Sequence, residues 1–335
     1  MENLTRSSHD LSRDKTQAPD KNEPKTAPKF NDPITTANGE VRGYVDLVKL
    51  ETLWINTGTL CNIECTNCYI ESSPKNDRLV YITHDEVIAY LDEIKHEAMG
   101  TREIGITGGE PFMNREIIAI MEECLSRGFQ LIVLTNAMRP MMRFKKELLA
   151  LNERYNSQLT LRVSIDHYSK MFHEEERGPR TWQPMLEGLK WLSDHAFTLD
   201  IAGRTRWGEN EGKLREGYAK FFVENNIAVD ASSHKQLVLF PEMAPETSVP
   251  EITNECWDIL SVNPNDMMCA SSRMVVKRKG AEKPAVIACT LLPYEDEFEF
   301  DSTLAESAKR VQLNHPFCSK FCVLGGGACS VKNDD

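Results

Sequence analysis

The sequence predicts an α/β fold, a partial (β/α)6 barrel of the TIM type with a small cysteine-rich C-terminal extension. Apolar strand-like stretches alternate with amphipathic helical stretches between about residues 50 and 240, as in a parallel sheet with crossover helices. About six such units fit into roughly 190 residues, whereas a complete eight-stranded barrel takes about 250. The chain continues to residue 335 with an irregular segment that is rich in cysteine.

Each expected strand is a short apolar run, and each expected helix has an apolar face between recognisable ends. The strands are expected at residues 51–57, 102–107, 129–134, 159–165, 197–202 and 236–240. Thr83 is expected to open the first helix, because Glu86 follows at the spacing of a capping box. Asn114 is expected to cap the second helix, and Gly128 to end it. The remaining helices are expected at residues 144–155, 181–195 and 214–225.

This pattern divides the chain into three regions, residues 1–42, 43–240 and 241–335. The first region is expected to be a disordered tether, because the run from Gln17 to Lys29 is rich in proline and charge and poor in apolar residues. The second region is the barrel, and the third is the cysteine-rich extension.

Composition argues against several classes of protein. With 41% hydrophobic and 27% charged residues, the chain has the balance of an ordinary soluble globular protein. No apolar run approaches the length of a membrane span, and the N-terminus lacks the apolar core of a secretory signal. The net charge of −12 disfavours a broad nucleic-acid-binding face. Ten cysteines in such a chain favour metal chemistry over disulfides, so we expect a cytoplasmic protein without membrane or nucleic-acid partners.

Three cysteines, Cys61, Cys65 and Cys68, follow the first expected strand at a C-x3-C-x2-C spacing. Three thiolates on one tight loop can hold three irons of a cubane [4Fe–4S] cluster and leave the fourth iron open to a substrate or cofactor. A zinc site or a set of buried thiols is the alternative for this triplet. Structural zinc takes four protein ligands, however, and the triplet supplies only three.

The second expected strand ends in the run Gly108-Gly109-Glu110-Pro111, which by itself is also typical of a strand-ending turn. Together with the cysteine triplet, it resembles the radical S-adenosylmethionine (SAM) enzymes, in which a Gly-Gly-Glu motif at this place binds the α-amino group of SAM. The resemblance implies that the triplet holds the catalytic, SAM-binding cluster and that Gly108, Gly109 and Glu110 bind SAM. The position before the third cysteine, often aromatic in the family and in contact with adenine, is Asn67 here.

The same resemblance implies that polar residues after the later strands contact SAM. They are Asn136 after the third strand, Ser164 and Asp166 at the end of the fourth, and Arg204 at the end of the fifth. Ser164 and Asp166 would point to the same face of a regular strand. A helix or turn cap is the alternative for Asp166. A surface salt bridge is the alternative for Arg206 and, to a lesser extent, for Arg204. Residues 173–178 resemble an Arg-Gly stretch that is common in a long loop of the family.

The extension resembles the SPASM/twitch extensions of radical SAM enzymes, which hold auxiliary [4Fe–4S] clusters. Residues 274–289 are expected to form a β-hairpin with a cysteine near each end. Six cysteines lie beyond residue 255, too few for two cubanes with four cysteines each, so one auxiliary cluster is expected. Its expected ligands are Cys269, Cys289, Cys318 and either Cys322 or Cys329. Cys256 and Cys124 are expected to be bystanders, and a zinc knuckle is the alternative to a cluster.

The resemblance therefore implies a radical SAM enzyme. Reductive cleavage of SAM at the first cluster would give a 5′-deoxyadenosyl radical that abstracts hydrogen from a small-molecule substrate, with the auxiliary cluster assisting oxidation or bond formation. Reduced ferredoxin or flavodoxin would donate the electron. A peptide- or protein-modifying maturase is the alternative; the small molecule is favoured because the polar N-terminus cannot be a folded leader-binding domain and only one auxiliary cluster is expected. A non-catalytic iron–sulfur carrier and a zinc-stabilised interaction module are the rivals from other classes.

Overall fold

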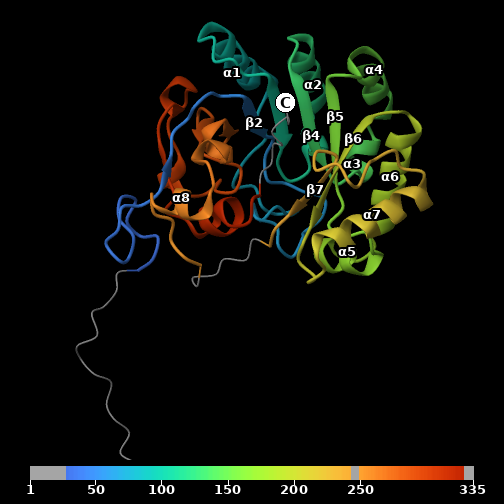
Figure 1. Ribbon diagram of the computed structural model, residues 1–335. Helices are drawn as coiled ribbons and strands as arrows, with labels where there is room; N and C mark the ends of the chain where they lie inside the picture. The colour runs from blue at the N-terminus through green and yellow to red at the C-terminus, as the bar shows by residue number, and fades with distance from the viewer. Residues whose placement is uncertain (1–27, 243–248, 328–335) are drawn as a thin grey trace, which may run out of the picture.

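The structure, a computed structural model, describes residues 28–242 and 249–327 (Figure 1). Within these residues the main sheet has eight strands in the order β7-β6-β5-β4-β3-β2-β8-β9. The barrel strands, all parallel, are β2 (Thr52–Asn56), β3 (Glu103–Thr107), β4 (Gln130–Thr135), β5 (Leu159–Ser164), β6 (Thr198–Arg204) and β7 (Leu237–Phe240). Each pairs with the next along the chain, as Thr52 does with Glu103. The expected partial barrel is therefore confirmed.

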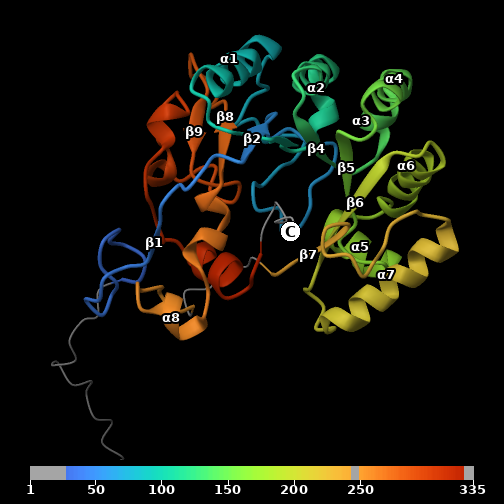
Figure 2. The same ribbon diagram turned by 45° about the horizontal axis from the view of Figure 1, so that its top comes forward.

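The expected helices lie on the outer side of the curved sheet, where Figure 2 shows them as an arc around the strands. They are α1 (His84–His96), α2 (Ile117–Ser126), α4 (Lys145–Tyr155), α6 (Trp182–Asp194) and α7 (Glu211–Asn225). Thr83 and Glu86 form the expected capping box at α1. Asn114 does not cap α2: the helix begins after Glu116, and the Asn114 side chain instead accepts from the Glu116 amide (2.9 Å) and donates to the Ile82 carbonyl (2.8 Å).

Two further short helices follow barrel strands where the sequence predicts loops. α3 (Arg139–Met142) follows β4, and α5 (Lys170–Arg177) follows β5. α5 is charged along most of its length, yet His173 and Glu176 on it are buried. No helix in the two described segments is both long enough and apolar enough to cross a membrane.

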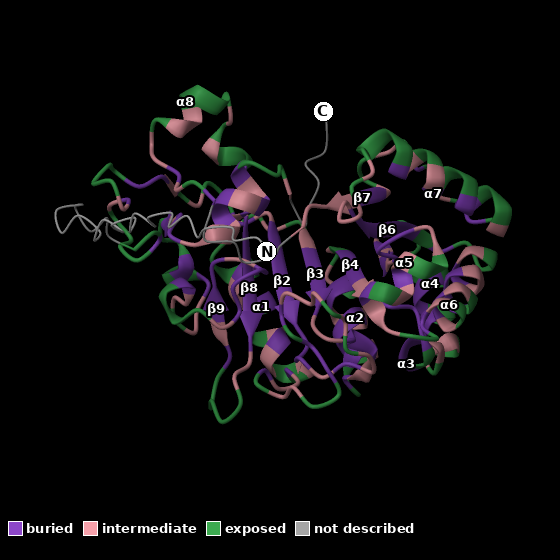
Figure 3. Ribbon diagram, turned by 90° about the horizontal axis from the view of Figure 1, so that it is seen from below, coloured by how far each residue is buried: buried purple, intermediate pink, exposed green. Residues whose placement is uncertain are grey.

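Apolar side chains fill both faces of the barrel sheet, and its strands are largely buried (Figure 3). Leu53 of β2 faces the helices and belongs to the large core that they cover, whereas Trp54 faces the other way and packs with Met274. Gly105 on β3 makes room for the indole ring, because a Cβ atom there would lie 2.4 Å from it. Trp54 therefore fills the inner side of the barrel next to β3.

The extension adds two strands to the barrel sheet. β8 (Ser272–Val276) pairs in parallel with β2, and β9 (Ala285–Ile287) pairs antiparallel with β8. The expected hairpin is confirmed, but it continues the barrel sheet instead of forming a separate layer. The other elements of the extension are α8 (Cys256–Leu260), the strand β10 (Val311–Gln312), a π-helical turn (Cys318–Val323) and short 3-10 helices at Pro264–Asp266, Met268–Ala270, Asp296–Phe298 and Ala305–Ser307.

The structure differs from the expected disordered tether in the last part of residues 1–42. Residues 28–42 lie against the extension, where Glu251 forms an ion pair with buried Arg42 (2.6 Å) and accepts a hydrogen bond from the Phe30 amide (2.7 Å). Directly after them, β1 (Tyr44–Val45) pairs antiparallel with β10. The prediction of disorder is wrong for residues 28–42, because their polar groups find partners in the extension. Residues 1–27 lie outside the described part of the chain.

Candidate active site

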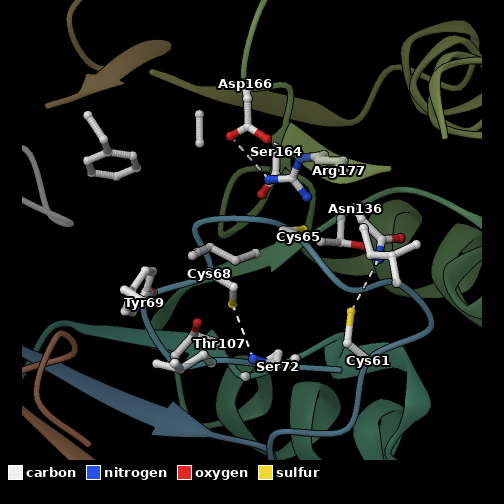
Figure 4. A pocket seen from close by; sticks show the side chains of 18 of the residues that line it. Cys61, Cys65, Cys68, Tyr69, Ser72, Thr107, Asn136, Ser164, Asp166 and Arg177 are labelled. Atoms are coloured by element: carbon white, nitrogen blue, oxygen red, sulfur yellow. Dashed lines mark hydrogen bonds and ion pairs between the residues drawn. The ribbon is translucent and has the colours of Figure 1, made fainter. Parts of the chain in front are cut away.

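The cysteine loop forms one wall of a cavity at the carboxyl ends of the barrel strands (Figure 4). The cavity has a volume of about 980 Å³, counted with the part that is open to solvent. The strand ends line it with Thr107, Leu134, Thr135, Ser164, Ala202, Arg204 and Phe240. Cys61, Cys65 and Cys68 all face this cavity with free thiols. The site thus lies where barrel enzymes carry their chemistry.

The three thiols fit an iron–sulfur cluster. The backbone amide of Ser72 donates to Cys68 Sγ (3.3 Å), and Asn136 Nδ2 contacts Cys61 Sγ (4.0 Å). Burial raises the pKa of the Cys61 thiol to about 12 and that of Cys65 to about 11. Burial therefore favours the protonated form of Cys61 and Cys65 in the protein alone, and binding to iron would deprotonate them. A donor set of three thiols with N–H groups beside the sulfurs suits a cubane held by three cysteines.

Helix α5 and the end of β6 hold the loop between the second and third cysteines. The Thr66 amide donates to the backbone carbonyl of Glu176 (2.8 Å), and the Asn67 amide donates to its carboxylate (2.9 Å). Arg204 donates to the Asn67 carbonyl (3.0 Å). Asn67 is thereby engaged with protein groups and is not among the described residues that line the cavity, in contrast to the aromatic residue of the family.

Gly108 and Gly109 let the end of β3 approach the start of the cysteine loop closely. A Cβ atom at position 109 would lie 2.3 Å from the carbonyl oxygen of Leu60, and one at position 108 would lie 2.7 Å from that of Gly58. Gly108 also has φ +146°, which side chains rarely allow. Both glycines line the cavity. Glycine is therefore needed at both positions so that the backbone at the end of β3 can lie this close to the backbone that leads into the cysteine loop.

Glu110 lies behind the cavity wall. It is buried, and its carboxylate accepts hydrogen bonds from the Phe112 amide (3.2 Å), Thr135 Oγ1 (2.9 Å) and the Asn136 amide (2.8 Å). Burial raises its pKa to about 7, against the effect of these hydrogen bonds. Glu110 is not among the described lining residues, although its neighbours Gly109 and Pro111 are. Its contact with the amino group of SAM stays a prediction.

Asp166 lies between two arginines on the wall across from Cys61 and Cys68 (Figure 4). Its carboxylate forms ion pairs with Arg177 (2.5 Å) and Arg204 (3.2 Å). Burial pushes the pKa of Asp166 up, but the two guanidinium groups outweigh burial and hold this pKa below its usual value. This network is the observed partner of Asp166 and Arg204, in place of the turn cap and surface salt bridge considered from the sequence.

The structure brings most of the expected SAM-binding residues to one cavity. Those that line it are Cys61, Cys65, Cys68, Gly108, Gly109, Asn136, Ser164, Asp166 and Arg204. Arg177 also lines it and was not among the expected site residues, although the Arg-Gly pair at positions 177 and 178 indicated it. Phe240, Leu291 and Phe321 complete an apolar wall that no sequence motif indicated.

A second group of cysteines lines a smaller cavity of about 370 Å³ in the extension, among apolar side chains. It consists of Cys269, Cys289, Cys318 and Cys322. Cys329 lies outside the described residues, and Cys256 contacts Thr253 instead of lining this cavity. Among the described residues, no three His, Cys, Asp or Glu side chains are close enough together to hold a single metal ion.

Residues 55–203 match the family model described as the Radical SAM superfamily. This range contains the cysteine triplet, the Gly-Gly-Glu motif and the Asp166 network. This segment of the chain belongs to the radical SAM superfamily. This match confirms the family and the fold class expected from the sequence.

Two curated relatives share parts of this radical SAM chain. AlbA of Bacillus subtilis (strain 168), an antilisterial bacteriocin subtilosin biosynthesis protein, is 24% identical over 286 residues, or 78% of this chain. The 7-carboxy-7-deazaguanine synthase of Koribacter versatilis (strain Ellin345) is 28% identical over 91 residues, or 27% of this chain. The chain spans 59% of the length of AlbA and 38% of that of the synthase.

Solved structures share the fold at low sequence identity. Streptococcus suis SuiB bound to its precursor peptide SuiA has a TM-score of 0.56 and 13% identity, over 84% of this chain and 67% of SuiB. The anSMEcpe structure with bound AdoMet has a TM-score of 0.54 and 15% identity, over 79% of both chains. These likenesses show a shared architecture.

Proposed function

We propose that this chain is a radical SAM enzyme that abstracts hydrogen from a peptide or protein substrate. The observation that carries the proposal is the single cavity on which three free thiols and the Asp166 network converge. The choice of a peptide substrate rests on relatives: AlbA is a bacteriocin biosynthesis protein, and SuiB is bound to a precursor peptide. This choice reverses the preference for a small molecule that the sequence suggests.

Different residues of the cavity would bind the cluster and the carboxylate of SAM. Cys61, Cys65 and Cys68 would hold a [4Fe–4S] cluster, which together with SAM supplies the 5′-deoxyadenosyl radical when an electron arrives from ferredoxin or flavodoxin. The guanidinium group of Arg177 has more N–H donors than its ion pair with Asp166 uses. It can therefore also donate hydrogen bonds to the carboxylate of SAM.

The apolar wall would receive the substrate and keep water from the radical. Phe240 at the end of β7 stacks on Phe321 of the extension, with ring centroids 5.9 Å apart. Together with Leu291 these rings place apolar surface on the side of the cavity that the extension covers. A closed, apolar surround protects a reactive intermediate from side reactions.

A second [4Fe–4S] cluster is proposed on Cys269, Cys289, Cys318 and Cys322. These four thiols line one cavity, the number of ligands that a fully coordinated cubane takes. The two sites are neighbours along the chain, because Phe321 lines the first cavity and Cys322 the second. A cluster held by these four cysteines would supply a one-electron acceptor.

The proposal is tested by following where the abstracted hydrogen comes from. The reconstituted protein would be incubated anaerobically with SAM, dithionite and a deuterated library of short peptides, and separately with a deuterated mixture of small metabolites. We expect deuterium in the 5′-deoxyadenosine formed with peptides, and peptides of changed mass. Deuterium transfer from the metabolite mixture alone would favour the small-molecule substrate.

A further inference from the structure

Arg273 on β8 is a charged residue buried inside the extension, with 0% of its surface exposed. Its guanidinium group donates hydrogen bonds to backbone carbonyls only: those of Cys269 (2.6 Å), Ser272 (2.8 Å), Ser307 (3.0 Å) and Lys309 (3.0 Å). The hydrogen bonds satisfy its donors and tie β8 to residues 307–309. They do not neutralise its charge.

No carboxylate among the described residues forms an ion pair with Arg273. Other buried arginines of this chain have one, as Arg42 does with Glu251 and Arg162 with Asp200. The neighbours of Arg273 that can become anionic are Cys269 and Cys289, two of the four thiols in the second cavity.

A buried, unpaired cation is costly, and proteins normally place an opposite charge beside it. A [4Fe–4S] cluster with four thiolate ligands carries a net negative charge, which would supply this partner. We propose that Arg273 is the buried countercharge of the auxiliary cluster, and that it favours both cluster binding and cluster reduction. The inference rests on the auxiliary cluster proposed above and goes beyond it by giving a positioning residue that acts on the cluster through its charge.

The direction of the effect follows from electrostatics. Reduction adds an electron to a cluster that is already negative, and a nearby fixed positive charge stabilises the reduced form more than the oxidised form. Net charge around a cluster is one of the factors that set its potential. Removing the charge of Arg273 should therefore shift the midpoint potential to more negative values and lower the iron that the site retains.

The test uses full-length protein in which Cys61, Cys65 and Cys68 are all replaced by Ala, so that iron reports the second site alone. In this background Arg273→Gln removes the charge, and Arg273→Lys keeps the charge but loses the planar set of donors. Arg310→Gln is the matched control, because Arg310 is exposed on a neighbouring segment and pairs with Asp46. Iron per chain, the midpoint potential from an EPR-monitored titration and the circular dichroism spectrum are measured for each.

A further variant covers the case in which Arg273→Gln does not fold. The guanidinium of Arg273 lies over the ring of Phe300 at 5.1 Å, and Phe300 is only half-buried. Phe300→Glu would place a carboxylate against Arg273 while leaving its hydrogen bonds to carbonyls in place. Phe300→Leu is the control for the loss of the ring.

We expect Arg273→Gln and Phe300→Glu to shift the midpoint potential to more negative values. Arg273→Lys, Arg310→Gln and Phe300→Leu should keep it near that of the parent. Equal shifts in Arg273→Lys and Arg273→Gln, with none in Phe300→Glu, would show a structural role and overturn the inference, as would unchanged potentials throughout. Absence of iron from the parent itself would instead reject the auxiliary cluster, and the countercharge with it.

Discussion

The carboxylate of Glu176 accepts two hydrogen bonds from Asn67, one from its backbone amide (2.9 Å) and one from its side-chain amide (3.0 Å). Glu176 is completely buried, and its charge is balanced by an ion pair with Arg206. Asn67 stands between the second and third cysteines of the cluster loop. Helix α5 therefore fixes the shape of this loop through a position that is often aromatic in the family.

Replacing Glu176 by Gln should loosen the cysteine loop. The variant loses the charge that Arg206 faces and can no longer accept both hydrogen bonds from Asn67. We expect the free energy of unfolding to fall by ~1.5–3 kcal/mol, as for hydrogen bonds to charged groups. Urea unfolding of the iron-free protein measures it. Glu175→Gln is the control, because Glu175 is partly exposed, and an equal loss in both variants would contradict the special role of Glu176.

Replacing Arg177 by Met should weaken SAM binding. Its guanidinium lies in the cavity beside Asp166. The loss of a hydrogen bond to a charged carboxylate costs ~1.5–3 kcal/mol, which is roughly a 10- to 150-fold rise in Kd. Equilibrium dialysis with the reconstituted protein measures the affinity. Arg180→Met changes an exposed arginine on the same segment and should leave the Kd unchanged. Wild-type affinity in Arg177→Met would remove Arg177 from the SAM site.

Glu110 should make the iron-free protein less stable as the pH rises. Its pKa is about 7 in the fold and close to 4.3 in an unfolded chain, so between these values the folded state binds more protons. Its contribution to stability is fully present below the unfolded pKa and is lost as the pH rises through 7. Over the whole range between the two pKa values and beyond, the loss amounts to about 4 kcal/mol. Urea unfolding at pH 5 and pH 8 measures it.

Glu110→Gln is the comparison for this pH dependence. Gln stays neutral at both pH values, so the variant should lack the part of the slope that comes from Glu110. The wild type and the variant should therefore differ most in their free energy of unfolding at pH 8. Parallel pH profiles would show that the carboxyl group of Glu110 does not titrate as its burial implies.

Replacing Gly109 by Ala should disrupt the contact between β3 and the cysteine loop. The added methyl group would lie 2.3 Å from the Leu60 carbonyl oxygen, and overpacking of this kind costs about 1–3 kcal/mol. We expect a lower melting temperature and less iron bound by the loop. Gly212→Ala on helix α7 is the control, since its methyl group would meet its nearest atom at an ordinary 3.5 Å. Full iron content with unchanged stability in Gly109→Ala would contradict the close approach.

The sequence sufficed for the barrel, because its strands and outer helices are marked by local periodicity and by end signals such as the capping box at Thr83. The sequence did not predict helix α5, because a segment with so many charged residues resembles an exposed loop. In the structure Glu176 on this helix is buried, with Arg206 from outside the helix as its partner. The sequence also could not show β8 beside β2, because that pairing joins segments far apart in the chain.

The sequence predicted those residues of the candidate site that belong to recognisable motifs. Cysteines and strand-end polar residues have fixed places in the radical SAM pattern, and they do line one cavity. Arg177 was indicated only by the Arg-Gly pair at positions 177 and 178, and its place in the cavity depends on α5, which the sequence did not predict. Phe321 and Leu291 were missed because they reach the cavity from the extension, and apolar residues of an irregular segment carry no signal of their own.

The central claim is that the first cavity cleaves SAM at a cluster held by Cys61, Cys65 and Cys68. The most direct measurement is 5′-deoxyadenosine formed by anaerobically reconstituted protein after addition of SAM and dithionite, with iron and sulfide counted per chain. We predict about eight irons and formation of 5′-deoxyadenosine in the wild type, against about four irons and none of the product when the three cysteines are replaced by Ala. Iron in the wild type without any product of SAM cleavage, also with peptides present, would contradict the account.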